Sequence, residues 1–244
     1  MSKKVFMLTV QSGKRLIAKG ILKNADVKNA IENHRLVVIA GTTNAYIMEE
    51  ISNGFDSASF RRGVTVAPGT KISAPAQVLD CVVTKDGIDQ SRDIFAIAPT
   101  LGPGDVILKG ANAVNLSDNK AGVLIASEIA GTIGACVPHV IGRRVKMILP
   151  VGVEKRVTLP IDQLADMANE PDGTGPRLYA APGKAYTEID AFNDLCGVEA
   201  HVLASGGVMG AEGATYFLCQ GTDEQLEKCS ELCRSIMNEP PLKL

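Results

Sequence analysis

One segment of this sequence, residues 36–51, constrains the fold more than any other. A run of apolar residues leads into Gly41, Thr42, Thr43 and Asn44, and a helical pattern follows as far as residue 51. This order predicts a buried strand, a tight turn and the first turn of a helix. The free N–H groups and the positive end of the helix dipole at such a turn suit an anion. We therefore expect Gly41, Thr42, Thr43 and Asn44 to bind an anionic ligand.

Two further apolar strands lead into turns of the same kind. The strand predicted over residues 105–108 precedes Lys109, Gly110, Ala111 and Asn112, and the strand over residues 146–150 precedes a turn that ends at Lys155. Parallel sheets bind ligands outside the carboxyl ends of their strands. We therefore expect the three turns to share one pocket, in which Lys109 acts as a point charge toward a phosphate or carboxylate. The alternative is a lysine that only extends from a strand end into solvent.

The alternation of strands and helices indicates the fold class. Over residues 1–158 it predicts an α/β, Rossmann-like domain whose mostly parallel sheet is flanked by helices and holds the anion site. Over residues 159–244 the order strand, helix, strand, strand, helix predicts a small C-terminal α+β lobe. The glycine-rich residues 206–213 lie between two strands of that lobe, so they predict a hairpin loop and not a dinucleotide site.

A lysine and a glutamate in the middle of the chain complete the predicted site. Residues 121–136 are small and apolar, which predicts a helix packed on the sheet, and Glu128 is its only charged residue. A carboxylate in such a helix would be desolvated, the condition for a general base near neutral pH. An exposed or lysine-paired glutamate is the alternative. Lys120 directly precedes this helix, where we expect it to hold an anion at the helix N-terminus.

Composition limits the classes of partner. The net charge of −2 argues against a nucleic acid or an anionic membrane surface. The longest apolar window, residues 122–137, is interrupted by polar residues, so we expect no membrane span. The first residues do not form a signal-peptide pattern, and the six cysteines lack CxxC spacing, which favours free thiols in the cytoplasm. The three histidines stand at no spacing typical of a metal or triad site, so we expect neither a metal nor a cofactor.

The three turns, in this order, resemble the superfamily of ribose-5-phosphate isomerase A, glucosamine-6-phosphate deaminase and the CoA transferases. The closest pattern is that of the isomerase, over roughly residues 13–155. Its phosphate turn resembles residues 41–44, its D-G-A-D turn resembles residues 109–112, and its following lysine and helix glutamate resemble Lys120 and Glu128. The resemblance implies this α/β fold and a sugar-phosphate ligand.

The chemistry of the second turn departs from the isomerase pattern. Lys109 and Asn112 stand where the isomerase has aspartates, and neither takes up a carbon-bound proton as a carboxylate does. Our first hypothesis is an isomerase-like enzyme in which Lys109 and Asn112 orient a carbonyl or hydroxyl and Glu128 moves the proton. The second is a non-catalytic ligand-binding or assembly protein, and the third is a CoA transferase with Glu154 as nucleophile. We also expect a homo-oligomer.

Overall fold

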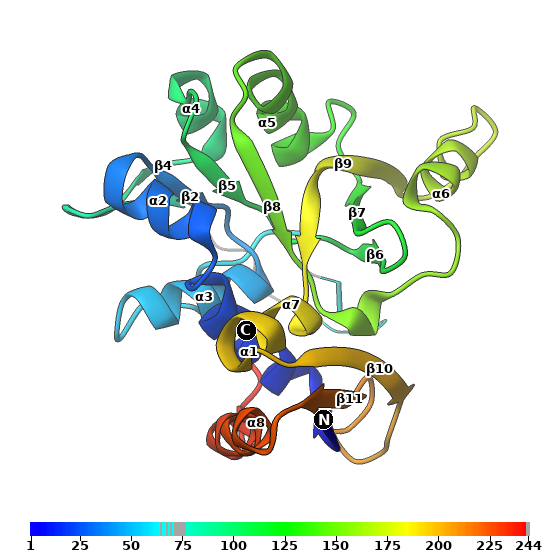
Figure 1. Cartoon of the computed structure of the whole chain (residues 1–244). Helices are drawn as coiled ribbons and strands as arrows, with labels where there is room; N and C mark the ends of the chain where they lie inside the picture. Colours follow the sequence, from blue (N-terminus) through cyan, green and yellow to red (C-terminus); the bar gives the residue numbers. More distant parts are fainter. Residues whose placement is uncertain (64, 67, 69, 71–76, 243–244) are drawn as a thin grey trace.

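Two sheets organise this α/β structure, which is a computed structural model describing residues 1–63, 65, 66, 68, 70 and 77–242 (Figure 1). In the described residues, the larger sheet has eight strands in the order β4-β3-β2-β5-β8-β9-β7-β6. These strands are β2 (Leu36–Val38), β3 (Asp80–Thr84), β4 (Gly87–Arg92), β5 (Val106–Leu108), β6 (Ala113–Asn115), β7 (Lys120–Ile125), β8 (Lys146–Pro150) and β9 (Arg177–Tyr186).

The larger sheet is mixed, whereas the sequence predicted a mostly parallel one. Its four central strands, β2, β5, β8 and β9, run parallel to their neighbours in this group. The hairpins β3–β4 and β6–β7 extend the two edges with antiparallel pairings. Short connections explain the difference, because a few residues suffice for an antiparallel hairpin while a parallel pair needs a long crossover.

Helices cover both faces of the larger sheet, and each face carries its own hydrophobic core. Successive residues of a strand point to opposite faces. Leu36 and Val38 of β2 therefore pack with α1, α3 and α7, whereas Val37 packs with α4 and α5. The helices are α1 (Val10–Ile21), α2 (Ala25–Asn33), α3 (Thr42–Ile51), α4 (Ile94–Ile97), α5 (Gly131–Gly142), α6 (Ile161–Ala168), α7 (Glu188–Cys196) and α8 (Asp223–Ile236), with short 3-10 turns at η1 (Ala98–Thr100) and η2 (Val153–Lys155). Among these described helices, none combines the length and apolar character that crossing a membrane requires.

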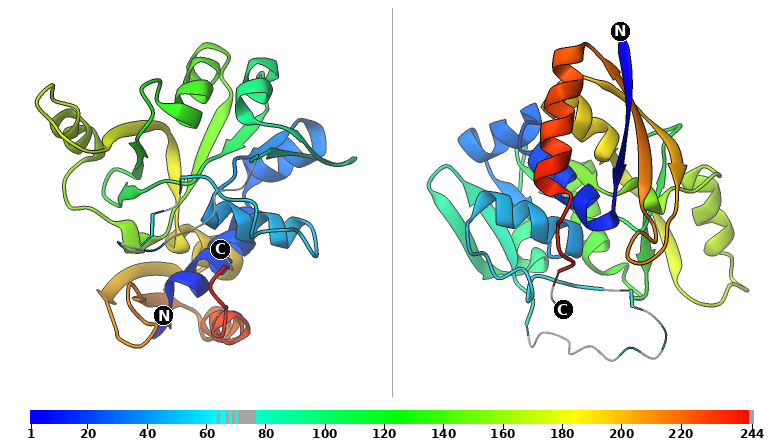
Figure 2. Two further views of the ribbon diagram at one scale, coloured as in Figure 1. Left: turned by 180° about the vertical axis from the view of Figure 1, so that it is seen from behind. Right: turned by 90° about the horizontal axis from the view of Figure 1, so that it is seen from below.

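The smaller sheet joins the N-terminal strand to two strands from late in the chain (Figure 2). Strand β1 (Ser2–Leu8) pairs with β11 (Thr215–Gly221), which also pairs with β10 (Glu199–Ser205). Residues 206–213 join β10 to β11, so the predicted hairpin loop is confirmed. Strand β9, by contrast, belongs to the larger sheet although it follows residue 158. Pairings thus cross the boundary between residues 158 and 159 in both directions, and the division there stays a prediction.

One predicted helix is wrong. Residues 121–136 do not form a single helix, since β7 occupies Lys120–Ile125 and α5 begins only at Gly131. A continuous apolar run fits a buried strand as well as a buried helix. Here the run is placed between β9 and β6, and the β-branched Val123 and Ile125 suit that pleated surface. Lys120 consequently lies on a strand, and Glu128 lies in the turn that follows it.

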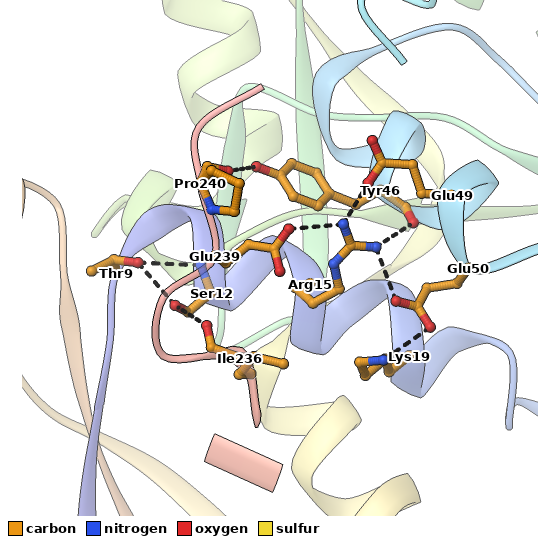
Figure 3. Close-up of polar contacts among 10 residues, drawn as sticks. All are labelled: Thr9, Ser12, Arg15, Lys19, Tyr46, Glu49, Glu50, Ile236, Glu239 and Pro240. Carbon is orange, nitrogen blue, oxygen red and sulfur yellow. Dashed lines mark hydrogen bonds and ion pairs between the residues drawn. The ribbon is translucent and has the colours of Figure 1, made fainter. Parts of the chain in front are cut away.

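A charged network fixes the segment after α8 to the two helices α1 and α3 (Figure 3). The guanidinium of Arg15 contacts the carboxylates of Glu49, Glu50 and Glu239, with N–O distances of 2.9 Å to Glu50 and 2.8 Å to Glu239. The hydroxyl of Tyr46 donates a hydrogen bond of 3.0 Å to the carbonyl of Pro240. The C-terminal segment is therefore held against the helix that follows the chain's first strand.

Candidate functional site

The three turns that follow β2, β5 and β8 lie side by side. These strands are neighbours in the sheet and run parallel, so their carboxyl ends meet at one edge. The residues there line a cavity of about 450 Å³. This volume falls within the range of small-molecule pockets. The structure thus brings together the three turns that the sequence predicted to share a pocket.

Eight of the predicted ligand-binding residues line this cavity, and one lies behind it. The lining residues are Gly41, Thr42, Thr43, Lys109, Gly110, Ala111, Asn112 and Lys155. The side chain of Asn44 is fully buried, and its amide donates hydrogen bonds to the carbonyls of Ile39 (2.7 Å) and Leu108 (3.0 Å). Asn44 therefore ties β2 to β5 and supports the cavity floor instead of contacting a ligand.

Lys120 and Glu128 are not among the residues that line the cavity, although both were predicted to belong to the site. The ammonium of Lys120 pairs with the carboxylate of Asp162 on α6, and Lys120 lines a different groove. Glu128 is exposed in the turn before α5 and is not part of the cavity lining. The burial on which its predicted role as a base depended is absent, because the helix that would have buried it does not form.

Among the described residues, three cations line the cavity, and the protein itself holds two of them. The ammonium of Lys155 donates a hydrogen bond of 2.9 Å to the carbonyl of Ala111. The guanidinium of Arg62 contacts the buried carboxylate of Asp80 at 3.2 Å and the carbonyl of Val78 at 2.7 Å. Both cations are therefore fixed in place before any ligand arrives.

The third cation, Lys109, is buried without such a partner. Its side chain is only 8% exposed, and within the described residues its ammonium makes no hydrogen bond or ion pair. Burial lowers the pKa of Lys109, and the neighbouring Arg62 lowers it further, whereas Cys136 and Asp80 act in the opposite direction. A buried lysine of this kind is costly for the protein unless a ligand uses it.

Asp80 organises the cavity wall, although sequence reasoning did not identify it. Its carboxylate accepts hydrogen bonds from the backbone N–H groups of Ala40 (2.8 Å) and Ile94 (2.6 Å) and also holds Arg62. It thereby links the turn after β2 to the start of α4. The only sequence signal for this wall was the pair Arg61-Arg62 inside an unusually long connection.

The N-termini of α3 and α5 border the cavity, and neither is capped by a side chain. The N-cap residues are Gly41 for α3 and Ala130 for α5, and both line the cavity. Helices α1, α2, α7 and α8, in contrast, each have a side-chain cap. Uncapped N-terminal N–H groups remain free to donate to an anion.

A tight turn positions the start of α5. Ala130 adopts a φ of 58°, in the left-handed region that is unfavourable for a residue with a Cβ. A Cβ on Gly134 would lie 2.3 Å from the carbonyl oxygen of Ile129, so the close packing of α5 against this turn requires glycine. Strained backbone of this kind is frequent at ligand sites.

A buried carboxyl supports the third turn from below. Glu188, the first residue of α7, is 3% exposed and accepts the N–H of Val153 at 2.9 Å. Burial raises the pKa of Glu188 to about 8, and the nearby Glu154 adds to this effect. Lys14 lies close enough to these groups for its pKa to be affected, and burial lowers it. In the sequence, Glu188 was indistinguishable from an ordinary acid in a first helical turn.

Comparison with known proteins adds no further assignment to this geometry. No protein-family model, no curated protein and no solved structure matches the chain. The function is therefore argued from the cavity alone.

Proposed function

We propose that this protein binds a small phosphorylated sugar, or a related small anion, in the cavity at the carboxyl ends of β2, β5 and β8. The observation that carries the proposal is Lys109, a buried lysine of the cavity lining whose ammonium has no partner among the described residues. An anionic group would supply the missing counter-charge. Arg62, Lys155 and the uncapped ends of α3 and α5 would supply the remaining donors.

The polarity of the lining supports a ligand with both a charged and a neutral end. Thr42, Ser127 and Thr132 offer hydroxyl groups, while Val123 and Ile133 offer apolar surface. No aspartate or glutamate belongs to the described lining. A phosphate beside the cations would therefore meet no carboxylate, and its sugar portion would find both hydroxyl and apolar contacts.

The second candidate function is that of a non-catalytic ligand-binding protein. The absence of carboxylates from the described lining favours it. Proton transfer of the isomerase type needs an acid or base at the substrate carbon. Glu128 lies outside the cavity lining, and so does Glu154, which lines a separate cavity with Arg156 and Ser205. The isomerase-like and CoA transferase hypotheses thus lack a positioned carboxylate in the described lining.

A thermal-shift screen with a matched pair of variants tests the proposal. Ribose 5-phosphate, glucosamine 6-phosphate and inorganic phosphate are titrated against the protein, with ribose as the uncharged control. A ligand present at a hundred times its Kd stabilises the folded state by about 2.7 kcal/mol. Lys155→Met removes a cation from the cavity, whereas Lys120→Met removes one from the Asp162 pair outside it.

We expect the phosphorylated compounds to raise the melting temperature and ribose to leave it unchanged. Lys155→Met should weaken phosphate binding by about tenfold, equivalent to about 1.4 kcal/mol, and Lys120→Met should leave it unchanged. The proposal is wrong if no phosphorylated compound stabilises the protein, or if the two variants weaken binding equally. Turnover of a compound that binds would then distinguish an enzyme from the non-catalytic binder.

A further inference from the structure

Lys109 differs from the other cavity cations in a way that binding alone does not explain. A lysine that serves only as a point charge for phosphate is most useful when its ammonium is permanently protonated. Here burial and the proximity of Arg62 both act against the charged form, and the pKa of Lys109 is lowered. Asp80 stabilises the charged form of Lys109 only to a limited extent, because its carboxylate already accepts hydrogen bonds from Arg62 and from two backbone N–H groups.

The cavity also contains donors other than Lys109 that can contact an anion. Arg62 and Lys155 are fixed by the protein, and the N-termini of α3 and α5 are uncapped. The cavity that Lys109 lines is also lined by apolar residues such as Val123, Ile125 and Ile133. A desolvated amine next to another cation and an apolar wall is the setting in which lysine acts as a nucleophile.

We propose that the side-chain amine of Lys109 forms a Schiff base with the carbonyl carbon of a small phosphorylated aldehyde or ketone whose phosphate is held by Arg62, Lys155 and the two helix ends. This inference rests on the proposed function, since the phosphate site places the carbonyl compound in the cavity. It goes further by naming the reactive group of the ligand and the atom that attacks it.

The step balances without any further reactant. The neutral Nζ of Lys109 adds to the carbonyl carbon, and a proton moves from nitrogen to oxygen to give a carbinolamine. One proton from solvent then lets the oxygen leave as water, as the nitrogen forms a double bond to carbon. The hydroxyls of Thr42, Ser127 and Thr132 line the same cavity as Lys109. The product is a protonated imine, which restores a positive charge beside the bound phosphate.

Reductive trapping tests the proposal on the intact protein. The protein is incubated with glyceraldehyde 3-phosphate and cyanoborohydride, which reduces the imine to a stable secondary amine, and the modified lysine is located by peptide mass mapping. Glycerol 3-phosphate, which has the phosphate but no carbonyl, is measured in parallel by thermal shift. Lys109→Arg keeps a cation without a nucleophilic amine, Lys155→Arg is the same change at the other lining lysine, and Lys120→Arg is the control outside the cavity.

We expect a single major adduct at Lys109 that excess inorganic phosphate suppresses. Lys109→Arg should lose the adduct. In Lys155→Arg and Lys120→Arg, the adduct should still be located at Lys109. Peptide mapping of the adduct on the wild-type protein identifies the reactive lysine even if Lys109→Arg fails to fold. If glycerol 3-phosphate stabilises the protein but the adduct lies at Lys155 or is spread over surface lysines, the Schiff base is overturned and the anion site stands. If neither compound has an effect, both proposals fail.

Discussion

Replacing Lys109 with methionine should make the ligand-free protein more stable. Methionine has a similar length and fills the same space, but it carries no charge to desolvate. Lys109 is 8% exposed, and its ammonium has no partner among the described residues. Replacing buried charged groups by apolar residues of similar volume is neutral or stabilising, so we expect a gain of about 1–3 kcal/mol. For a domain of this size, each kcal/mol raises the melting temperature by about 2–4 °C.

The matched variant Lys155→Met should change stability in the opposite direction. The ammonium of Lys155 donates a 2.9 Å hydrogen bond to the carbonyl of Ala111, and its loss should destabilise the protein by about 1 kcal/mol. Urea unfolding with and without inorganic phosphate measures both effects. Phosphate at a hundred times its Kd would add about 2.7 kcal/mol to the wild type and less than this to Lys109→Met, which keeps Arg62 and Lys155 in the cavity lining. The stability advantage of Lys109→Met should therefore shrink or reverse as phosphate is added.

One result would refute this reasoning. If Lys109→Met folds, is less stable than the wild type and still responds to phosphate as the wild type does, then Lys109 is a structural residue. The cavity would then not depend on the charge of Lys109.

Three further predictions concern the supports of the fold and of the cavity. The pKa of Glu188 is raised to about 8 in the folded protein, so the folded state retains a proton that the unfolded state has released. The stability of the protein should therefore be highest below about pH 4.5 and fall by up to about 1.4 kcal/mol per pH unit toward pH 8. Urea unfolding of Glu188→Gln should lack this slope. Arg15→Met should destabilise the protein by about 1–3 kcal/mol and expose the C-terminal segment to limited proteolysis, because three carboxylates lose their shared cation. Arg234→Met removes an exposed ion pair and should behave as the wild type. If protease cleaves the C-terminal segment equally slowly in both variants, this account is contradicted. Gly134→Ala should reduce the thermal shift with phosphate, because its Cβ must displace the carbonyl of Ile129 in the turn that positions Ala130 and Gly131 of the cavity lining. An unchanged shift would show that binding does not depend on the position of this turn.

The central part of the fold was predictable because local pattern and tertiary role agree there. The strand β8 has the predicted bounds. The three turns were recognisable because apolar strands stop abruptly at small or polar residues. Parallel strands then place those turns at one edge, and eight predicted residues line one cavity.

The errors arose where the same residues satisfy two structures. The run after Lys120 is apolar enough for a helix or a strand, and only its pairing with β9, more than fifty residues later, decides between them. Because a strand forms there, Glu128 lies in an exposed turn and Lys120 lines a groove separate from the candidate site. Asp80 and Glu188 were missed for a related reason: their roles depend on backbone N–H groups of Ala40, Ile94 and Val153, which are distant in sequence.

The pairing of β1 with β11 has a consequence for synthesis on the ribosome. Strand β1 is translated before β11, its hydrogen-bonding partner, and Leu8 pairs with the distant Thr215. Phe6 and Leu8 are buried in the folded protein, but in the nascent chain they remain exposed until β11 is translated. Chains with such distant contacts fold slowly and expose apolar surface meanwhile. A ribosome stalled before residue 215 should thus carry an accessible N-terminal strand, which a chaperone would be able to bind.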